Sequence, residues 1–359
     1  MIIKEGHVMH NPIDKNFQRK QTDINDFRKE ILEALPLNLR EILKKLPSTI
    51  SKDMEEIRLR ANQPLILYAR GKDFSVDEKG NITSEPSKGY IVKIEDIEKA
   101  YQLITNYSVY AVEEEIRNGF ITLKGGHRVG ICGKVVLQGS SIYTIKNISG
   151  LNIRISKQKI GVSDRIMRYL INSENIFCNT LIISPPQCGK TTLLRDIIRN
   201  LSNGMTDLGI HGFKVGVVDE RSEICGVYQG IPQNNVGIRT DILDACPKAQ
   251  GMMMLIRSMS PQIIATDELG KEEDIYAIQE ALSAGIHILT TVHGRSIEEI
   301  SRRPHLNTLI KQKIFERMII LSNQPTVGTI QLILDTHNDH VLYRNKQIQE
   351  KNRRKELVC

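Results

Sequence analysis

The sequence lacks tryptophan, and its aromatic residues together make up only 5% of 359 positions. Proteins that bind single-stranded nucleic acids stack the bases on aromatic side chains, so this composition disfavours such a platform. The formal net charge of +7 leaves three interpretations open: a nucleic-acid partner, an anionic membrane surface, or a merely soluble basic protein.

Long hydrophobic runs are also missing. No apolar stretch approaches the roughly 18 residues that a membrane-spanning helix needs, and the first residues are too polar for the core of a secretion signal. We therefore expect a cytoplasmic protein. No Cys-x-x-Cys pair occurs, which disfavours both a zinc site and a disulfide framework. The six cysteines are Cys132, Cys178, Cys188, Cys225, Cys246 and Cys359.

The length allows two domains with separate cores. We expect a mobile tail over 1–25, an α+β domain over 26–155, an α/β domain over 156–344 and a basic tail over 345–359. In the first domain, hydrophobic periodicity predicts helices over 24–35, 39–46, 94–105 and 108–117. Strands are predicted over 57–60, 64–68, 127–137 and 141–148, with a polar turn over 71–81.

The second domain alternates strand and helix patterns. Strands are predicted over 180–184, 215–219, 262–267, 286–292 and 317–321, and a closing hairpin over 329–334 and 340–343. Helices are predicted after residue 189 and over 247–259, 272–284 and 297–302. This alternation predicts a parallel sheet that is covered on both faces, with its ligand site at the carboxyl ends of the strands.

One loop in this domain has the pattern of a phosphate-binding loop. An apolar strand pattern ends at Ser184, and a helical pattern follows Gly189-Lys190-Thr191. Backbone N–H groups and a helix N-terminus would bind phosphate there, Lys190 would reach the β- and γ-phosphates, and Thr191 would bind Mg²⁺. Ser184 stands where the motif has glycine, and two prolines remove backbone donors. The predicted nucleotide-binding residues are Ser184, Pro185, Pro186, Gln187, Cys188, Gly189, Lys190, Thr191 and Thr192.

Other strand ends carry acidic residues and a histidine. Asp267-Glu268 follows an apolar run in the manner of a Walker B strand, so Asp267 would hold Mg²⁺ through water and Glu268 would activate the attacking water. Asp219 and Glu220 form a second acid pair, with Asp219 a further Mg²⁺ ligand and Glu220 a further catalytic candidate. Alternatively, one of this pair forms an ion pair with Arg221. His293 ends the next strand and is either a sensor of the γ-phosphate or a structural residue.

These motifs, in this order, resemble the secretion ATPases of type II and type IV systems and the pilus retraction motors. Segments such as Val218-Asp-Glu-Arg-Ser-Glu-Ile224 and Gly251-Met-Met-Met-Leu-Ile-Arg-Ser-Met-Ser-Pro261 are more similar still to the stage III sporulation protein AA family, over about 30–345. The resemblance implies a RecA-like P-loop core and an ATPase that uses ATP and Mg²⁺. It further implies a homo-hexameric ring docked, on the mother-cell side, at a membrane complex between mother cell and forespore.

In ring ATPases a neighbouring subunit commonly lends an arginine to the active site. The candidates for this role are Arg239, Arg257, Arg295, Arg154 and Arg128. Two alternatives to a ring motor stay open: a nucleic-acid-dependent RecA-like ATPase, which the low aromatic content disfavours, and a scaffold that binds the nucleotide without turnover. Ser184 slightly favours the scaffold, and the two acid pairs disfavour it.

Overall fold

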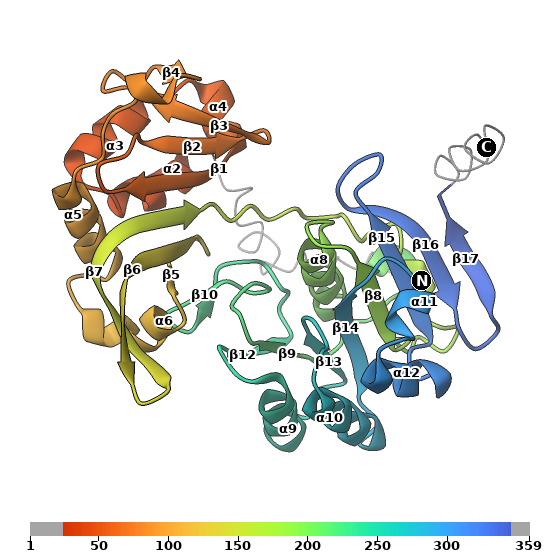
Figure 1. The fold of residues 1–359 in the computed structure, drawn as a ribbon. Helices are drawn as coiled ribbons and strands as arrows, with labels where there is room; N and C mark the ends of the chain where they lie inside the picture. Colours follow the sequence, from red (N-terminus) through yellow and green to blue (C-terminus); the bar gives the residue numbers. More distant parts are fainter. Residues whose placement is uncertain (1–23, 346–359) are drawn as a thin grey trace, which may run out of the picture. The chain divides into compact units, whose positions relative to one another are not determined.

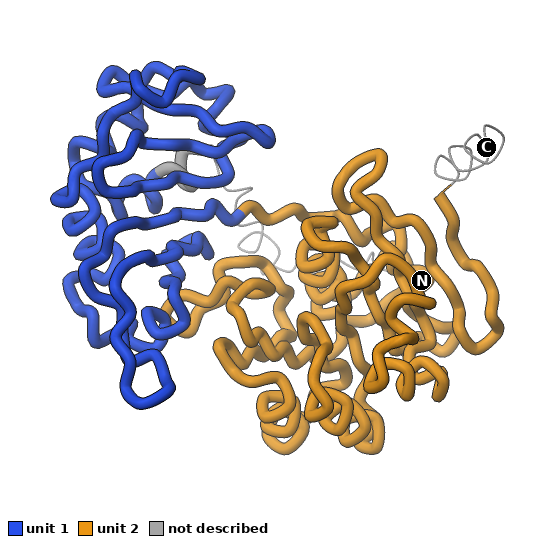
Figure 2. Tube along the Cα trace, viewed as in Figure 1, with its two compact units in different colours: residues 1–156 blue, residues 157–359 orange. Residues whose placement is uncertain are grey.

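The computed structural model describes residues 24–345, which fall into two compact units that divide between Ser156 and Lys157 (Figure 2). Each unit has its own sheet and its own hydrophobic core. The helices within the described range are all too short or too polar to cross a membrane.

The first unit is built on a seven-stranded antiparallel sheet in the order β4-β3-β2-β1-β7-β6-β5 (Figure 1). Its strands are β1 (Met54–Arg60), β2 (Ile66–Ala69), β3 (Lys72–Val76), β4 (Ile82–Thr83), β5 (Phe120–Thr122), β6 (Arg128–Gln138) and β7 (Ser141–Arg154). Its α-helices are α2 (Ile24–Glu33), α3 (Leu37–Lys44), α4 (Ser48–Asp53), α5 (Ile94–Ile104) and α6 (Glu113–Arg117). Short 3-10 turns lie at η1 (Pro86–Lys88) and η2 (Val109–Val112).

Helical periodicity explains how α5 packs. Ile97, Ala100 and Ile104 recur on one face of the helix and are buried in the core of the unit. The polar turn predicted over 71–81 is wrong for its first half, which forms β3. Ser75 and Val76 are buried there, and pairing with β2 outweighs the turn-like composition of this segment.

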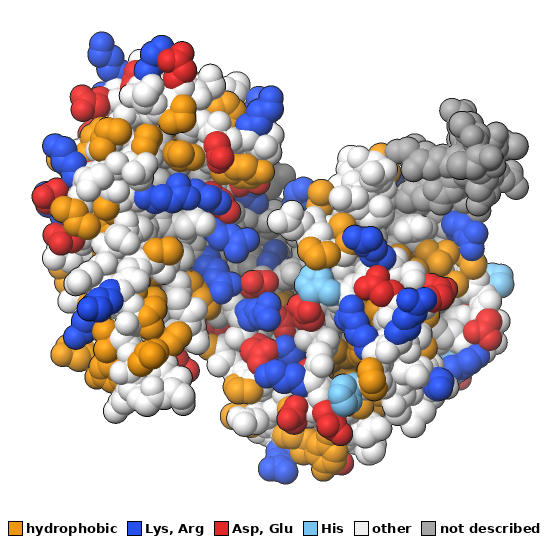
Figure 3. Space-filling view, viewed as in Figure 1, with side chains coloured by type: hydrophobic (Ala, Val, Ile, Leu, Met, Phe, Trp, Pro, Cys, Tyr) orange, Lys and Arg blue, Asp and Glu red, His pale blue; other side chains and the backbone are white. Residues whose placement is uncertain are grey.

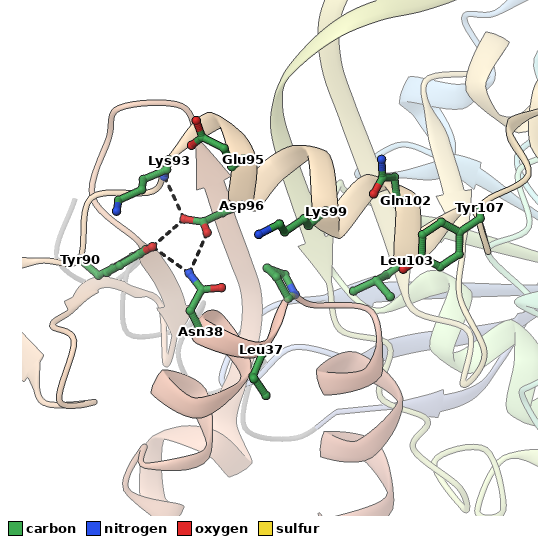
Figure 4. A pocket seen from close by; sticks show the side chains of 11 residues that line it. Leu37, Asn38, Tyr90, Lys93, Glu95, Asp96, Lys99, Gln102, Leu103 and Tyr107 are labelled. Carbon is green, nitrogen blue, oxygen red and sulfur yellow. Dashed lines mark hydrogen bonds between the residues drawn. The ribbon is translucent and has the colours of Figure 1, made fainter.

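A pocket of about 750 Å³ opens between α3 and α5 (Figure 4). A polar network lies on its wall: Asn38 donates hydrogen bonds to the Tyr90 hydroxyl at 2.9 Å and to Asp96 Oδ1 at 2.7 Å. The Tyr90 hydroxyl donates in turn to Asp96 Oδ2 at 2.7 Å, and burial raises the pKa of Tyr90 to about 12. Because Asn38 belongs to α3 and Asp96 to α5, these hydrogen bonds join the two helices.

The second unit is built on an eight-stranded mixed sheet in the order β12-β9-β13-β14-β8-β15-β16-β17 (Figure 1). The pairs from β12 to β15 are parallel, and β16 and β17 are antiparallel additions. The strands are β8 (Thr180–Ser184), β9 (Val215–Asp219), β12 (Thr240–Asp244), β13 (Ile263–Thr266), β14 (His287–His293), β15 (Arg317–Ser322), β16 (Thr329–Asp335) and β17 (His340–Arg344). A separate ribbon pairs β10 (Val227–Tyr228) with β11 (Ile231–Pro232).

Hydrophobic cores lie on both faces of this sheet, which explains its nearly continuous apolar strands. On β8, Ile182 belongs to the core that contains α8, whereas Leu181 and Ile183 belong to the core that contains α9 and α10. The helices are α7 (Met167–Leu170), α8 (Lys190–Asn203), η3 (Thr206–Leu208), α9 (Lys248–Ser258), α10 (Glu272–Ser283), α11 (Ile297–Ile300) and α12 (Pro304–Lys311).

The predicted α/β fold class is confirmed, and the main sheet is mixed through its closing hairpin. Several elements of this unit are not predicted by the sequence patterns: the helices α7 and α12, the turn η3, the edge strand β12 and the ribbon of β10 and β11. The two predicted tails, over 1–25 and 345–359, stay predictions, because 1–23 and 346–359 lie outside the described residues.

Candidate active site

The loop between β8 and α8 has the backbone shape of an anion cradle. Gly189 is the N-cap of α8 with φ 83°, and Gln187 has φ 60°, so two positions adopt the left-handed conformation. The first N–H groups of a helix have no acceptor within the helix, and the helix dipole is positive there. A polyphosphate would satisfy these donors.

Ser184, the departure from the motif, is accommodated without strain. Its side chain is buried, and Oγ donates a hydrogen bond to the carbonyl oxygen of Pro185 at 2.9 Å. Its own carbonyl oxygen accepts from the N–H of Gly294 at 3.2 Å. The serine therefore ties the start of the loop to the end of the neighbouring strand β14.

A turn from the other side of β8 lies against the same loop. It connects β15 to β16, and the N–H of Gly328 donates to the carbonyl oxygen of Cys188 at 3.1 Å. A Cβ placed on Gly189 would lie 3.4 Å from the Cα of Gly328. Glycine at 189 thus serves both the left-handed conformation and this close backbone approach.

Three predicted site residues from three different elements meet at the loop. Lys190 Nζ lies 3.2 Å from Glu268 Oε2 and 2.9 Å from His293 Nε2. His293 Nε2 lies 3.1 Å from the same Glu268 oxygen. These residues come from the start of α8, the end of β13 and the end of β14, so the carboxyl edge of the sheet assembles them.

Two buried polar atoms of β14 have no hydrogen-bond partner among the residues that the structure describes. They are His293 Nδ1 and Thr291 Oγ1. Buried polar groups in native structures are nearly always satisfied by protein, ordered water or ligand. Their position on the site strand is consistent with a polar ligand at this edge.

A second cluster joins the two acid pairs through a residue that the sequence did not point to. The Lys248 ammonium contacts the Glu220 carboxylate and lies 3.4 Å from Asp267 Oδ1. Burial raises the pKa of Asp267 to about 6, although the nearby Lys248 opposes the shift. Burial lowers the pKa of Lys248, but the carboxylates of Glu220 and Asp267 outweigh it and leave that pKa above its ordinary value. A single lysine at a helix start has no pattern that would have revealed this role.

Asp219 is placed differently from the metal ligand that the sequence suggested. Its carboxylate is buried and accepts hydrogen bonds from the backbone N–H groups of Glu223, Ile224 and Cys225, at 2.9, 3.0 and 2.8 Å. Arg195 of α8 bonds to carbonyl oxygens of the same turn. This geometry favours a structural role, in which Asp219 and Arg195 hold the turn after β9.

The five candidate arginines belong to different elements of the two units. Arg239 donates to the Ser202 carbonyl oxygen at 2.9 Å, at the end of α8. In the first unit, Arg128 stacks over the Phe120 ring at 3.5 Å and Arg154 lies 3.8 Å from Glu56. Arg257 and Arg295 are exposed, on the last turn of α9 and just after β14.

The residues present fit a magnesium-bound nucleoside triphosphate. The loop offers backbone donors and the Lys190 cation, and Thr191 and Asp267 offer the oxygen ligands that Mg²⁺ prefers. On the face of the second unit drawn in Figure 3, acidic and basic side chains are interspersed, with no large patch of one sign. At the site edge itself, the ion pairs of Lys190 with Glu268 and of Lys248 with Glu220 compensate the charges locally.

Solved structures that are similar to this chain include a pilus retraction motor and an ATPase. The pilus retraction motor PilT, solved with bound ADP, is 14% identical, with 85% of this chain and 83% of that chain covered and a TM-score of 0.49. The ATPase DotB of Legionella pneumophila is 17% identical, with 74% and 72% covered and a TM-score of 0.47.

Sequence comparison is more decisive. Stage III sporulation protein AA of Bacillus subtilis (strain 168) is 41% identical over 306 residues, which cover 85% of this chain and 94% of that protein. The family model described as "Sporulation stage III, protein AA" matches residues 25–341. The chain therefore belongs to the stage III sporulation protein AA family.

Proposed function

We propose that this chain is an ATPase that binds ATP with Mg²⁺ at the loop 184–192 and hydrolyses it to ADP and phosphate. The observation that carries the proposal is the convergence of Lys190, Glu268 and His293 from three elements at one sheet edge. A loop that bound a phosphate group for structural reasons would not require a carboxylate and an imidazole beside its lysine.

Each residue has a distinct task in this mechanism. Lys190 exchanges its carboxylate partner for the β- and γ-phosphate oxygens, which frees Glu268. Glu268 then accepts a proton from the attacking water as the general base. His293 donates to the γ-phosphate, and Thr191 and Asp267 would hold the metal ion. When bound, Mg²⁺ neutralises charge that develops on the phosphate oxygens.

The biological setting is proposed at a finer level than the family name. We infer a homo-hexameric ring in the mother-cell cytoplasm, docked at a membrane-embedded sporulation complex, in which ATP hydrolysis changes the ring's conformation. Closed rings use heterologous interfaces, so an arginine from a neighbouring copy would complete each site. Nucleic acid is not among the proposed partners, and filter binding of single-stranded DNA and RNA over a range of salt concentrations tests this.

Phosphate release by the Glu268→Gln variant tests the catalytic proposal. The substitution keeps the shape and removes the base, so turnover should fall by roughly 10²-fold or more while ATP and Mg²⁺ still bind. Glu273→Gln is the matched control, because Glu273 is an exposed carboxylate on the neighbouring helix α10. Equal turnover in the parent and in Glu268→Gln would remove Glu268 from the mechanism. Binding of ATP without turnover in every assembly state would favour the scaffold alternative.

A further inference from the structure

Lys248 occupies an unusual position for a lysine. It is the first residue of α9, directly after Pro247, and its side chain is only 7% exposed. Lysine is almost never buried unless it is paired. Its ammonium lies between the ends of β9 and β13, where it contacts Glu220 on one side and Asp267 on the other.

With Lys248 in place, the carboxylates of the acid pairs all have partners from the chain itself. Glu268 pairs with Lys190, Asp219 accepts three backbone N–H groups, and Lys248 serves the two that remain. Within 24–345, no three His, Cys, Asp or Glu side chains are arranged to hold a metal ion. A metal ion at this edge therefore needs further ligands, and phosphate oxygens would supply them.

We propose that the positive charge of Lys248 prevents divalent metal ions from binding to Glu220 and Asp267 until a nucleotide binds. This inference rests on the proposed ATPase function and specifies how its metal ion is admitted. Two carboxylates at the ends of adjacent strands would otherwise attract a hard cation. A fixed positive charge in contact with both repels such an ion, and burial limits the screening of that repulsion by salt.

The binding order follows from this arrangement. Without nucleotide, the ammonium of Lys248 already compensates the charges of Glu220 and Asp267, so free Mg²⁺ binds them weakly. Lys248 contacts one oxygen of Asp267, Oδ1, and the second oxygen can serve a metal ion whose remaining ligands come from phosphate and water. On this arrangement the metal ion would bind together with the triphosphate.

The test measures Mn²⁺ binding to the full-length protein without nucleotide, by the electron paramagnetic resonance signal of free Mn²⁺. Lys248→Met should bind one Mn²⁺ about tenfold or more tighter than the parent, because the repelling charge is gone. Lys248→Arg keeps the charge and should behave as the parent. Lys311→Met, on the exposed end of α12, is the control for loss of a lysine elsewhere. The added affinity should disappear in Lys248→Met/Asp267→Asn.

A merely structural Lys248 would not produce a gain of metal affinity. If Lys248→Met does not fold, as judged by circular dichroism, Lys248→Gln is measured in its place, since the amide can still donate hydrogen bonds to both carboxylates. A folded Lys248→Met or Lys248→Gln protein with parental Mn²⁺ affinity would overturn the proposal. The measurement needs no ATP, so it separates this inference from the ATPase proposal. If the parent shows no ATP turnover but Lys248→Met gains Mn²⁺ affinity, only the ATPase proposal is refuted.

Discussion

Replacement of Lys190 by alanine should separate nucleotide binding from folding. In the proposed complex Lys190 makes charge-assisted hydrogen bonds to two phosphate groups, and each such bond contributes about 1.5–3 kcal/mol. Their loss amounts to about 3–6 kcal/mol, which corresponds to roughly a 10²- to 10⁴-fold rise in the Kd for ATP.

The cost to stability should be small, for reasons visible in the structure. The Lys190 side chain is 15% exposed and its partner Glu268 is 30% exposed, so water can solvate the carboxylate once the lysine is gone. A partly exposed ion pair contributes about 1 kcal/mol or less. Alanine also has a high helix propensity, and removal of a cation from the start of α8 suits the helix dipole.

The assay is calorimetric titration of ATP with Mg²⁺, accompanied by guanidinium unfolding of the same preparations. Lys311→Ala, an exposed lysine in α12, is the control. We expect the free energy of unfolding of Lys190→Ala to lie within about 1 kcal/mol of that of the parent. ATP binding by this variant should be too weak for a Kd to be fitted. A Kd equal to that of the parent would refute the assignment of the loop. If Lys190→Ala fails to fold, the stability argument is wrong and Lys190 is required for folding.

Three further predictions concern the second acid pair, the buried carboxylate and assembly. Glu220→Gln should reduce turnover less than Glu268→Gln does, because Lys248 rather than Lys190 holds Glu220; a larger loss would move the base to Glu220. The pKa of Asp267 is raised from 3.8 to about 6, so ionisation costs up to about 3 kcal/mol in the folded state and stability declines as pH rises from about 4 to about 6. Asp267→Asn lacks this titration, so its free energy of unfolding in guanidinium should rise relative to that of the parent across that pH range. A difference in free energy that stays constant with pH would contradict the raised pKa of Asp267. Specific ATPase activity should rise with protein concentration, and a monomer of constant activity over a hundredfold dilution would exclude the ring.

The central strands of the second unit could be predicted because their sequences carry one strong pattern. The bounds expected for β8 and β9 agree with the structure, because both segments are short, mainly apolar runs in which all five residues are buried, as in a parallel strand that is covered on both faces. The edge strand β12 has Asp241 and Asp244 in a short segment that is only half-buried, so its composition resembles a loop. Its pairing with β9 is a tertiary effect that local propensity does not contain.

The site shows the same division between local and tertiary information. Lys190, Glu268 and His293 could be predicted from motif spacing, because each follows or ends an apolar strand pattern and the three motifs occur in a recognised order along the chain. The identical pattern at Asp219 does not distinguish a metal ligand from a carboxylate that caps a turn, and the difference appears only with the three N–H donors in place. Lys248 could not be predicted, because its importance comes from two strands that meet it in space.

The hydrogen bond from Gly328 to Cys188 has a mechanical consequence. The loop between β8 and α8 is hydrogen-bonded at Ser184 to Gly294, just after β14, and at Cys188 to Gly328 in the β15–β16 turn, so different parts of the sheet hold its two ends. Any displacement of the loop at Cys188 would therefore move the β15–β16 turn and, with it, the start of β16. The antiparallel strands β16 and β17 are thus coupled mechanically to the loop, although they lie on the opposite side of β8 from β13 and its acidic residues.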